Sequence, residues 1–374
     1  MTVGEERCRN LMKSFEYLCL KCLQSFRGER SISAIYHLFR GKKSSQTIQD
    51  ANIFSLVNVY GLFPDLNRNF LQQTINFLQT EQLIREVHSE HCEVTDKGKK
   101  QLSDGEKLYY LSPYLNGYAY KDKSLTFWKR YSLLVQTMSN LAGKERTFIP
   151  IQYDESIQRW VKNYLLSQKG SSKKQLLHDL FNETYSLLTQ LPANQATVFA
   201  LKLSGYRHTG NTDEQIAKSL KKDSAWIHVE FQSALHFIIQ SLEEKGVAST
   251  YNSFFSICRD LLERPLLTET TQKSLKLLHQ GLSLSEIANI RRLKESTIED
   301  HVVEIAMQIR EFSLIPYVKE EDIAAIQAVI HDLQTHQLRR IKEQLNNQDI
   351  SYFQIRLVLT RMGDSDEPRH SAGS

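Results

Sequence analysis

Apolar side chains recur at helical spacing along most of the chain, and the clearest pattern lies between residues 268 and 309. One face of the last segment there carries Ile298, Val302, Ile305 and Ile309. Their steps of four, three and four residues are those of an amphipathic helix. A leading helix with Leu275, Leu278 and Leu282 and a short middle helix come before it. Three helices in this order, joined by tight turns, are typical of a helix-turn-helix.

Pairs of serine and glutamate mark the predicted helix starts in this segment. Ser283 and Glu286 stand at the spacing of a capping box, in which the hydroxyl and the carboxylate satisfy two free backbone N–H groups. Ser296 and Glu299 repeat that spacing before the last helix. Many helix-turn-helix units bind proteins, so the pattern predicts the fold more specifically than it predicts DNA binding.

A second helix-turn-helix pattern lies between residues 191 and 242. Thr212 and Gln215 stand at capping-box spacing, and Ser224 is placed to cap a long amphipathic helix. The chain therefore contains at least two predicted helix-turn-helix units at irregular spacing, which excludes a solenoid of regular repeats.

The N-terminal pattern changes from helical spacing to alternation. Apolar positions predict helices over residues 15–26, 31–40 and 65–80, and the alternation in 83–95 predicts two short strands with a turn at Ser89 and Glu90. Three helices followed by a β-hairpin are the elements of a winged helix.

Polar and basic side chains in this N-terminal region predict DNA contacts. Amides and arginine make paired hydrogen bonds to base edges, and they occupy the outer face of the third helix. The lysines after the hairpin are placed to meet phosphates. Two further lysines after Gly41 can clasp a backbone phosphate, although a solvated loop is an equal alternative there. The predicted DNA-binding residues are Lys42, Lys43, Arg68, Asn69, Gln72, Gln73, Lys97, Lys99 and Lys100.

Cysteine and histidine occur close together in two places, and neither place predicts a metal site. Cys19 and Cys22 have the CxxC spacing, but they lie on the apolar face of the first helix, where core packing explains them better. His88, His91 and Cys92 come from the strands and the turn, and they do not close a site by themselves.

Residues 105–131 are unusually aromatic, with lysine and arginine interleaved. Such a stretch can stack single-stranded bases, or its rings can pack a connector against neighbouring domains. We favour packing.

Bulk composition narrows the class of protein. Of the 374 residues, 41% are hydrophobic and 24% are charged, as in soluble globular proteins. No run of about 18 apolar residues predicts a membrane span, and the first residues lack the apolar core of a secretion signal. Five scattered cysteines suit a reducing compartment, and a net charge of +4 permits nucleic acid without requiring it. We expect a cytoplasmic, nucleoid-associated protein.

The predicted fold is mainly α, with an N-terminal winged helix followed by helical domains that contain two helix-turn-helix units. The predicted domains are a winged helix (13–102), an aromatic-rich connector (103–150), a helical domain with a helix-turn-helix (151–245), a C-terminal helix-turn-helix domain (253–362) and a disordered tail (363–374).

Three segments resemble known families. The segment LCLKCLQSFRGERSISAIYHLFRGKKSSQTIQD is similar to the start of the bacterial YpbB-like proteins and to the winged helix (RQC domain) of RecQ-type DNA helicases. The C-terminal GLSLSEIANIRRLKESTIEDHVVEIA with YFQIRLVL resembles the helix-turn-helix domain at the end of some RecQ helicases and of YpbB. Residues 191–242 show a weaker similarity to region 4 of sigma factors. The resemblance implies an accessory protein of a RecQ-type helicase that acts in replication, recombination or repair, with other proteins of these processes as further possible partners.

Departures from the helicases limit what the resemblance implies. A Walker phosphate loop needs a glycine and a Ser or Thr where Tyr36 and Lys43 stand, so no ATP site is expected. Ser89 and Glu90 at the predicted wing tip include no aromatic ring, which puts a strand-separating role in doubt. No serine sits in a nucleophile elbow and no acid–base cluster is visible. We expect no enzyme activity, no cofactor and no small-molecule substrate.

Charge assigns different roles to the three units. The last helix of the C-terminal unit carries Glu295, Glu299, Asp300 and Glu304, and phosphates repel carboxylates. The N-terminal unit is therefore the predicted DNA contact, and the later units are predicted to hold a helicase through Trp226, Arg291, Arg292 and Lys294. Two alternatives remain open: a sigma-like regulator that binds DNA and RNA polymerase, and an adaptor that binds only proteins.

Overall fold

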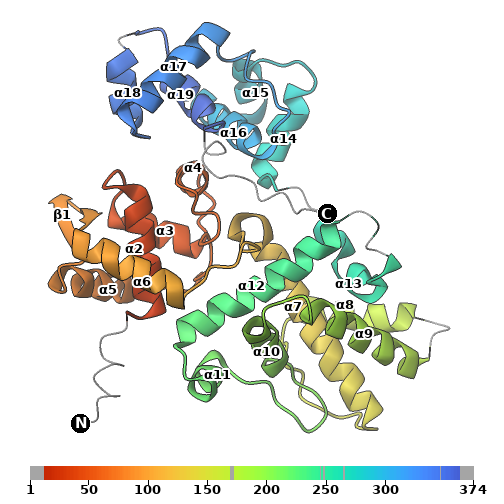
Figure 1. Cartoon of the computed structure of the whole chain (residues 1–374). Coiled ribbons are helices and arrows are strands. Elements are labelled where there is room, and N and C mark those ends of the chain that lie inside the picture. The colour runs from red at the N-terminus through yellow and green to blue at the C-terminus, as the bar shows by residue number, and fades with distance from the viewer. Residues whose placement is uncertain are drawn as a thin grey trace. The chain divides into compact units, whose positions relative to one another are not determined.

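The computed structural model describes residues 12–168, 172–244, 246, 249–263, 266–345 and 347–362 (Figure 1). In these ranges the chain forms helices α2 to α19 and a single two-stranded antiparallel hairpin. The predicted mainly α class is confirmed. The predicted disordered tail lies outside the described residues. No helix of the described ranges is long and apolar enough to cross a membrane.

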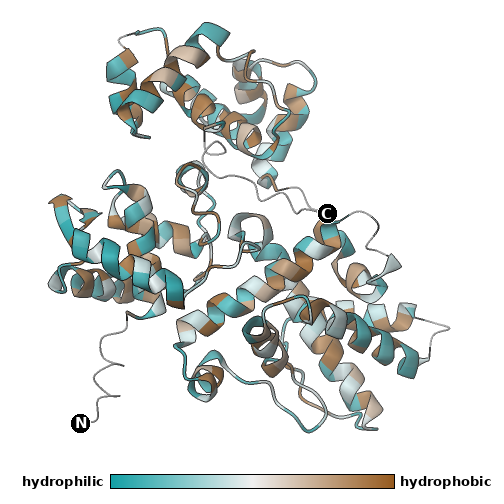
Figure 2. Cartoon of the chain, viewed as in Figure 1, coloured by the Kyte–Doolittle hydropathy of each residue, from teal (hydrophilic) through white to brown (hydrophobic). Residues whose placement is uncertain are grey.

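The chain divides into two compact units. The central unit comprises residues 1–18 and 103–264, and the terminal unit comprises residues 19–102 and 265–374. Regions from the two ends of the chain thus share one unit. Along the helices of both units, hydrophobic and hydrophilic residues are interspersed (Figure 2).

The central unit is built from helices around one apolar core. Its helices are α7 (Gly117–Ala142), α8 (Glu155–Ser167), α9 (Lys173–Leu188), α10 (Ala193–Leu201), α11 (Asp213–Leu220), α12 (Ser224–Glu243) and α13 (Asn252–Leu262). The predicted C-terminal domain started at residue 253, whereas α13 belongs to the central unit. Phe127 and Tyr131 of the aromatic stretch are fully buried in this core, as the packing interpretation requires.

Helix α12 is the buried centre of the middle helix-turn-helix. The capping box of Thr212 and Gln215 forms at the start of α11. The predicted cap of α12 is wrong by one residue: Asp223 accepts the backbone N–H of Trp226, and Ser224 is already helical. A carboxylate suits this position because the N-terminus of a helix carries partial positive charge.

A buried histidine in α12 predicts acid sensitivity of the central unit. The backbone N–H of Asn116 donates to Nδ1 of His236 at 3.2 Å, and burial lowers the pKa of His236 to about 3. As the pH falls below about 6.5, this histidine becomes protonated in the unfolded chain but stays neutral in the folded chain. The free energy of unfolding therefore decreases. Between pH 7 and pH 5 the loss is about 2 kcal/mol for this histidine, from about 1.4 kcal/mol per pKa unit.

The measurement is urea unfolding followed by tryptophan fluorescence, because all three tryptophans lie in the central unit. His236→Gln keeps an acceptor for the Asn116 N–H and is expected to remove about 2 kcal/mol of the pH dependence. His178→Gln is the control, since His178 is exposed in the same unit. Equal pH dependence in His236→Gln and the wild-type protein would rule out this origin of the acid sensitivity.

The terminal unit contains two groups of elements. The first is most of α2 (Ser14–Phe26), α3 (Ile32–Arg40), α4 (Ser45–Ile53), α5 (Arg68–Thr80), β1 (Ile84–His88), β2 (His91–Val94) and the start of α6 (Asp96–Leu108). The second is α14 (Glu269–Leu278), α15 (Leu284–Arg291), α16 (Glu295–Gln308), α17 (Glu320–Leu333), α18 (Leu338–Leu345) and α19 (Tyr352–Leu359).

The first group matches the predicted three helices and hairpin and adds one helix. Ile84 pairs with Val94 and His88 with His91, and a further bridge joins Ser31 to His91. Helix α4 was not predicted, because polar side chains occupy part of its buried face. Gln49 and Asp50 are buried there beside Ile48. Periodicity of apolar residues cannot reveal such a helix.

The second group contains the predicted C-terminal helix-turn-helix, α14 to α16. The capping box of Ser283 and Glu286 forms as predicted. The second predicted capping box is wrong: α16 begins at Glu295 after Lys294, so Ser296 lies inside the first turn and cannot cap it. Lys294 is extended and makes no side-chain cap bond.

Helix α16 is the central helix of the terminal unit. It packs against α14 and α15 of its own helix-turn-helix, and also against α19 and α4. From His301 to Ala306 every residue is buried. An extended polar contact joins the two groups: Arg356 of α19 pairs with Asp300 of α16 at 2.6 Å and donates to the Ser45 hydroxyl at 2.6 Å. The two groups are therefore held together through α16.

Candidate nucleic-acid interface

The outer face of α5 is polar, as the sequence predicts. Leu71, Ile75 and Leu78 anchor the opposite face in the core. The exposed side chains on the outer face are Arg68, Asn69, Gln72, Gln73 and Asn76. Phe70 and Phe77 are about half exposed along one edge of the helix, so its surface also carries apolar side chains.

A positively charged cluster lies at the N-terminal end of α5. The guanidinium of Arg68 stands 4.7 Å from the ring centre of Tyr36, and Arg40 lies over the same ring and donates to its hydroxyl at 2.8 Å. Burial lowers the pKa of His37, and Lys42, Arg68 and Arg40 lower it further. The positive charges of Lys42, Arg68 and Arg40 therefore lie close enough together to affect the same imidazole. Lys43 is exposed in the same loop as Lys42, between α3 and α4.

Sequence reasoning did not select Tyr36 and Arg40 as members of this cluster. Their spacing of four residues in a predicted helix is the available signal, because such side chains are neighbours on a helix surface. Their juxtaposition with Arg68 comes from the packing of α3 against α5 and could not be read from the chain.

A second group of cations lies at the other end of α5, and it does not belong to the hairpin. The sequence placed Lys97, Lys99 and Lys100 after the hairpin, and the structure shows them within the first five residues of α6. Helix α6 starts here because the Thr95 hydroxyl accepts the backbone N–H of Gly98 at 3.1 Å. Gly98 also lets the helix approach the hairpin, since a Cβ at this position would stand 2.1 Å from the carbonyl oxygen of Leu83. Cations thus lie at both ends of α5, whose 13 residues span roughly 20 Å.

Two of these lysines already have partners on the protein. Lys97 donates to the carbonyl of Glu81 at 2.7 Å, and Lys99 pairs with Asp96 at 3.0 Å. These contacts are exposed, and exposed ion pairs contribute about 0–1 kcal/mol. A phosphate can therefore compete for both lysines.

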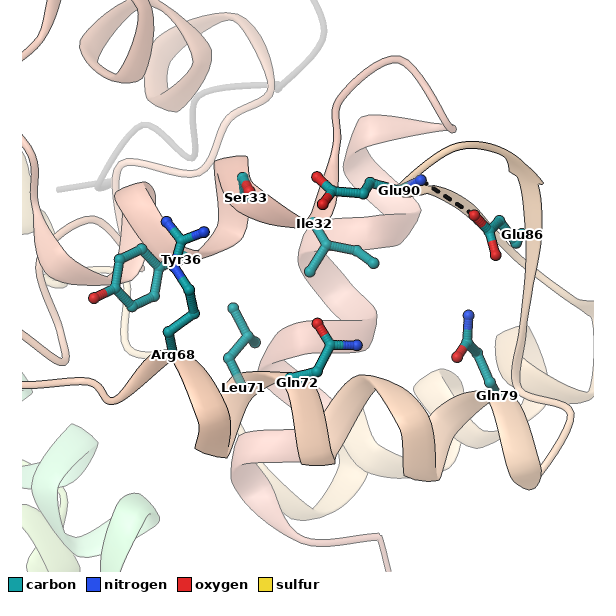
Figure 3. A pocket seen from close by; sticks show the side chains of 9 residues that line it. All are labelled: Ile32, Ser33, Tyr36, Arg68, Leu71, Gln72, Gln79, Glu86 and Glu90. Atoms are coloured by element: carbon teal, nitrogen blue, oxygen red, sulfur yellow. Dashed lines mark hydrogen bonds between the residues drawn. The ribbon is translucent and has the colours of Figure 1, made fainter.

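The hairpin itself carries acidic side chains. Glu86 and Glu90 face a cleft of about 270 Å³ between the hairpin, α3 and α5 (Figure 3).

The histidines and the cysteine of the hairpin do not form a metal site. The His88 and His91 rings stack with their centres 4.1 Å apart, while Cys92 is buried in the core. Among the described residues, no group of three or more His, Cys, Asp or Glu side chains could hold a metal ion.

The predicted partner residue of the middle unit is not at the surface. Trp226 is only 5% exposed, donates its indole N–H to Glu230 at 3.0 Å and packs on the ring of Tyr109. Its role as an exposed anchor is therefore corrected. The indole is buried because its N–H finds a partner inside the unit.

The predicted partner residues of the C-terminal unit divide into two kinds. Arg291 donates to the carbonyl and to the hydroxyl of Thr270, both at 2.8 Å, so it ties α15 to α14. Arg292 and Lys294 are exposed beside Leu293 and Ile290, and Ile290 is 59% exposed. The turn before α16 therefore presents two cations and two apolar side chains.

The four acidic residues of α16 do not form one exposed surface. Glu304 is buried and accepts the backbone N–H of Thr268 at 2.6 Å, at the start of α14. Asp300 is paired with Arg356. Only Glu295 is fully exposed, while Glu299 is half-buried and its pKa is raised by burial and by Glu295. The carboxylates of α16 therefore repel phosphates less than four free carboxylates would. Because the rest of the helix is buried, only its first turn is accessible to DNA or to a partner.

Comparison with known proteins adds two findings. A model of a helix-turn-helix domain matches residues 270–359. The chain is 32% identical over 357 residues to the protein YpbB of Bacillus subtilis (strain 168). The aligned region covers 93% of this chain and 97% of that protein. No solved structure matches the chain.

Proposed function

We propose that this chain, which belongs to the YpbB family, is a DNA-binding accessory protein of a RecQ-type helicase. It has no catalytic activity of its own in this proposal and acts in DNA replication, recombination or repair, as the resemblance of its segments to RecQ-type helicases implies. A helix-turn-helix domain supports DNA binding in general. The observation that carries the more specific proposal is the pair of cationic groups at the two ends of α5, with amides exposed between them.

This arrangement suits a duplex. The major groove of B-DNA is about 12 Å wide and is bordered by phosphates on both sides. A helix of roughly 20 Å with amides at its centre and cations at its ends can read base edges while lysine and arginine meet the two backbones. The N-terminal group of elements is therefore the proposed DNA-binding part.

The order of elements supports a winged helix. In a winged helix a short extended segment after the first helix pairs with the last strand of the hairpin. Ser31 follows α2 and bridges to His91 of β2, which fits this pattern. Helix α5 then takes the place of the recognition helix, and α4 is an insertion that contacts α16.

The C-terminal helix-turn-helix, α14 to α16, is the proposed binding site for the helicase. Its α16 is covered on several sides, so it cannot lie deep in a groove, whereas the turn at Ile290, Arg292, Leu293 and Lys294 is exposed. Apolar and cationic side chains together are common in protein interfaces. The sigma-like alternative receives less support, because α12 of the middle unit is buried along nearly its whole length.

Two measurements with the purified full chain test the proposal. Fluorescence anisotropy with unrelated duplexes is expected to show binding that weakens with salt, and a tagged chain is expected to retain a RecQ-type helicase rather than RNA polymerase from the same organism. ATP is not expected to be hydrolysed. Retention of the polymerase, or an absence of DNA binding at low salt, would favour the regulator or the protein-only adaptor instead.

A further inference from the structure

The cleft beside α5 has opposite charges at its two ends. Figure 3 shows Arg68 next to Tyr36 at one end, and Glu86 and Glu90 from the hairpin at the other. Ile32 and Leu71 contribute an apolar floor, and Gln72 and Gln79 project from α5 along one side. Electrostatics therefore favours a ligand with a negative end toward Arg68 and hydrogen-bond donors toward the glutamates.

The hairpin holds its acidic end in place. The backbone N–H of Glu90 donates to the Glu86 carboxylate at 3.2 Å, and Glu90 itself has a left-handed backbone at φ 60°. The turn thus brings two carboxylates to the same side of the hairpin, above the cleft. Two carboxylates at this place weaken the binding of phosphates to the surrounding surface by repulsion. We therefore expect the ligand to donate hydrogen bonds to these carboxylates, which offsets that loss of affinity.

The size of the cleft restricts the ligand further. Pockets for drug-sized molecules usually measure about 300–1,000 Å³. A cleft of about 270 Å³ lies just below this range, so it suits a small ring such as a nucleobase better than a drug-sized molecule. The apolar side chains of Ile32 and Leu71 can contact the face of such a ring, and the amides of Gln72 and Gln79 can contact its edges.

We propose that this cleft binds one unpaired, amine-bearing base of a DNA strand, with the strand's phosphate toward Arg68 and the base edge toward Glu86 and Glu90. The inference rests on the proposed DNA-binding function and names the substrate class: DNA with an unpaired nucleotide next to a duplex. Carboxylates accept the exocyclic amine of cytosine, whereas thymine presents a carbonyl oxygen at the same position. The cleft therefore distinguishes two pyrimidines of nearly equal size.

The test compares two duplexes that carry a single unpaired nucleotide, cytosine or thymine, in the same sequence. With the full chain at fixed salt, the cytosine probe is expected to bind about fivefold or more tightly, the lower limit for one good base contact. Glu86→Ala together with Glu90→Ala is expected to bring the ratio to about one, while the affinity for thymine stays equal or rises because two negative charges are removed.

A matched control removes two negative charges elsewhere in the terminal unit. Asp65→Asn with Glu321→Gln changes exposed carboxylates outside the cleft and is expected to leave the cytosine preference unchanged. Arg68→Gln is expected to weaken both probes alike. Far-UV spectra show whether each variant is folded, and the single variants Glu86→Ala and Glu90→Ala serve as milder replacements should the alanine pair not fold, each expected to reduce the cytosine preference in part.

The outcomes separate this inference from the proposed function. Binding of both probes with a ratio of one in the wild-type protein overturns the inference alone, and this is also the result if the cleft holds a cationic side chain of a protein partner. A cytosine preference that persists undiminished in the Glu86→Ala, Glu90→Ala variant, or in both single alanine variants should the pair not fold, overturns it as well. No binding of either probe overturns the proposed function itself.

Discussion

Replacing Lys97, Lys99 and Lys100 by glutamate will weaken DNA binding by roughly 100-fold or more at 0.1 M salt. Each phosphate contact contributes a slope of about −0.9 to the dependence of log affinity on log salt, so three contacts account for roughly 2.7 decades between 0.1 M and 1 M salt. Four contacts over the whole surface predict a slope near −3.6, and the variant should lose up to about 2.7 of it. Salt titrations by anisotropy with unrelated sequences measure both quantities.

The matched control reverses exposed cations of the C-terminal turn. Arg292→Glu with Lys294→Glu is expected to change the salt slope little and to weaken retention of the helicase. Arg291 is left intact because it holds α14 through Thr270, and its loss would perturb the fold itself. If the C-terminal pair abolishes DNA binding while the lysine variant binds normally, the two units have been assigned the wrong roles.

Replacing Arg356 by alanine will loosen α4 from α16 and lower the stability of the terminal unit by about 1.5–3 kcal/mol. The guanidinium pairs with Asp300 at 2.6 Å and donates to Ser45 at 2.6 Å and to Gln49 at 3.1 Å. Its side chain is only 17% exposed, so these charge-assisted bonds are partly shielded from water. Asp300 is 40% exposed and can regain water, which keeps the loss below that of a fully buried pair.

Hydrogen exchange of the full chain measures this effect, because it reports opening of α4 and α16 separately from the central unit. Both helices are expected to exchange faster in Arg356→Ala. The control is Arg339→Ala, which removes an arginine that is 83% exposed and pairs with Glu343 along α18, and which should cost no more than about 0.5 kcal/mol. Unchanged protection of α4 and α16 in Arg356→Ala would contradict a role for Arg356 in holding the two helices together.

Arginine and tryptophan show why several site predictions needed the structure. Both side chains combine a large body with hydrogen-bond donors, so their type alone fits an interface as well as a satisfied interior position. Trp226 and Arg291 were predicted as partner contacts, yet Glu230 and Thr270 supply acceptors inside the fold. Thr270 lies on another helix, 21 positions before Arg291, and no local pattern in the sequence reveals that contact. Glu230 lies one turn after Trp226 on α12, so their spacing of four residues is a local signal, but that spacing does not show that this turn of the helix is buried.

The sequence alone determined the features that depend on neighbours within about four residues. The helical class, the hairpin over residues 84–94 and the capping boxes at Thr212 and Ser283 all follow from short-range spacing, because backbone hydrogen bonds and caps join nearby residues. The outward direction of Arg68 and the amides of α5 follows from the same periodicity.

Only the tertiary structure decided which of these surfaces remain open. Ser45 and Gln49 of α4 meet Arg356, about 300 positions later in the chain. This contact helps to cover α16, the last helix of the clearest helix-turn-helix pattern in the sequence. Likewise, Arg68 meets Tyr36, and the hairpin brings Glu86 and Glu90 over the cleft. Contacts between residues far apart in sequence depend on how whole helices pack against one another, and spacing along the chain contains no direct record of that packing.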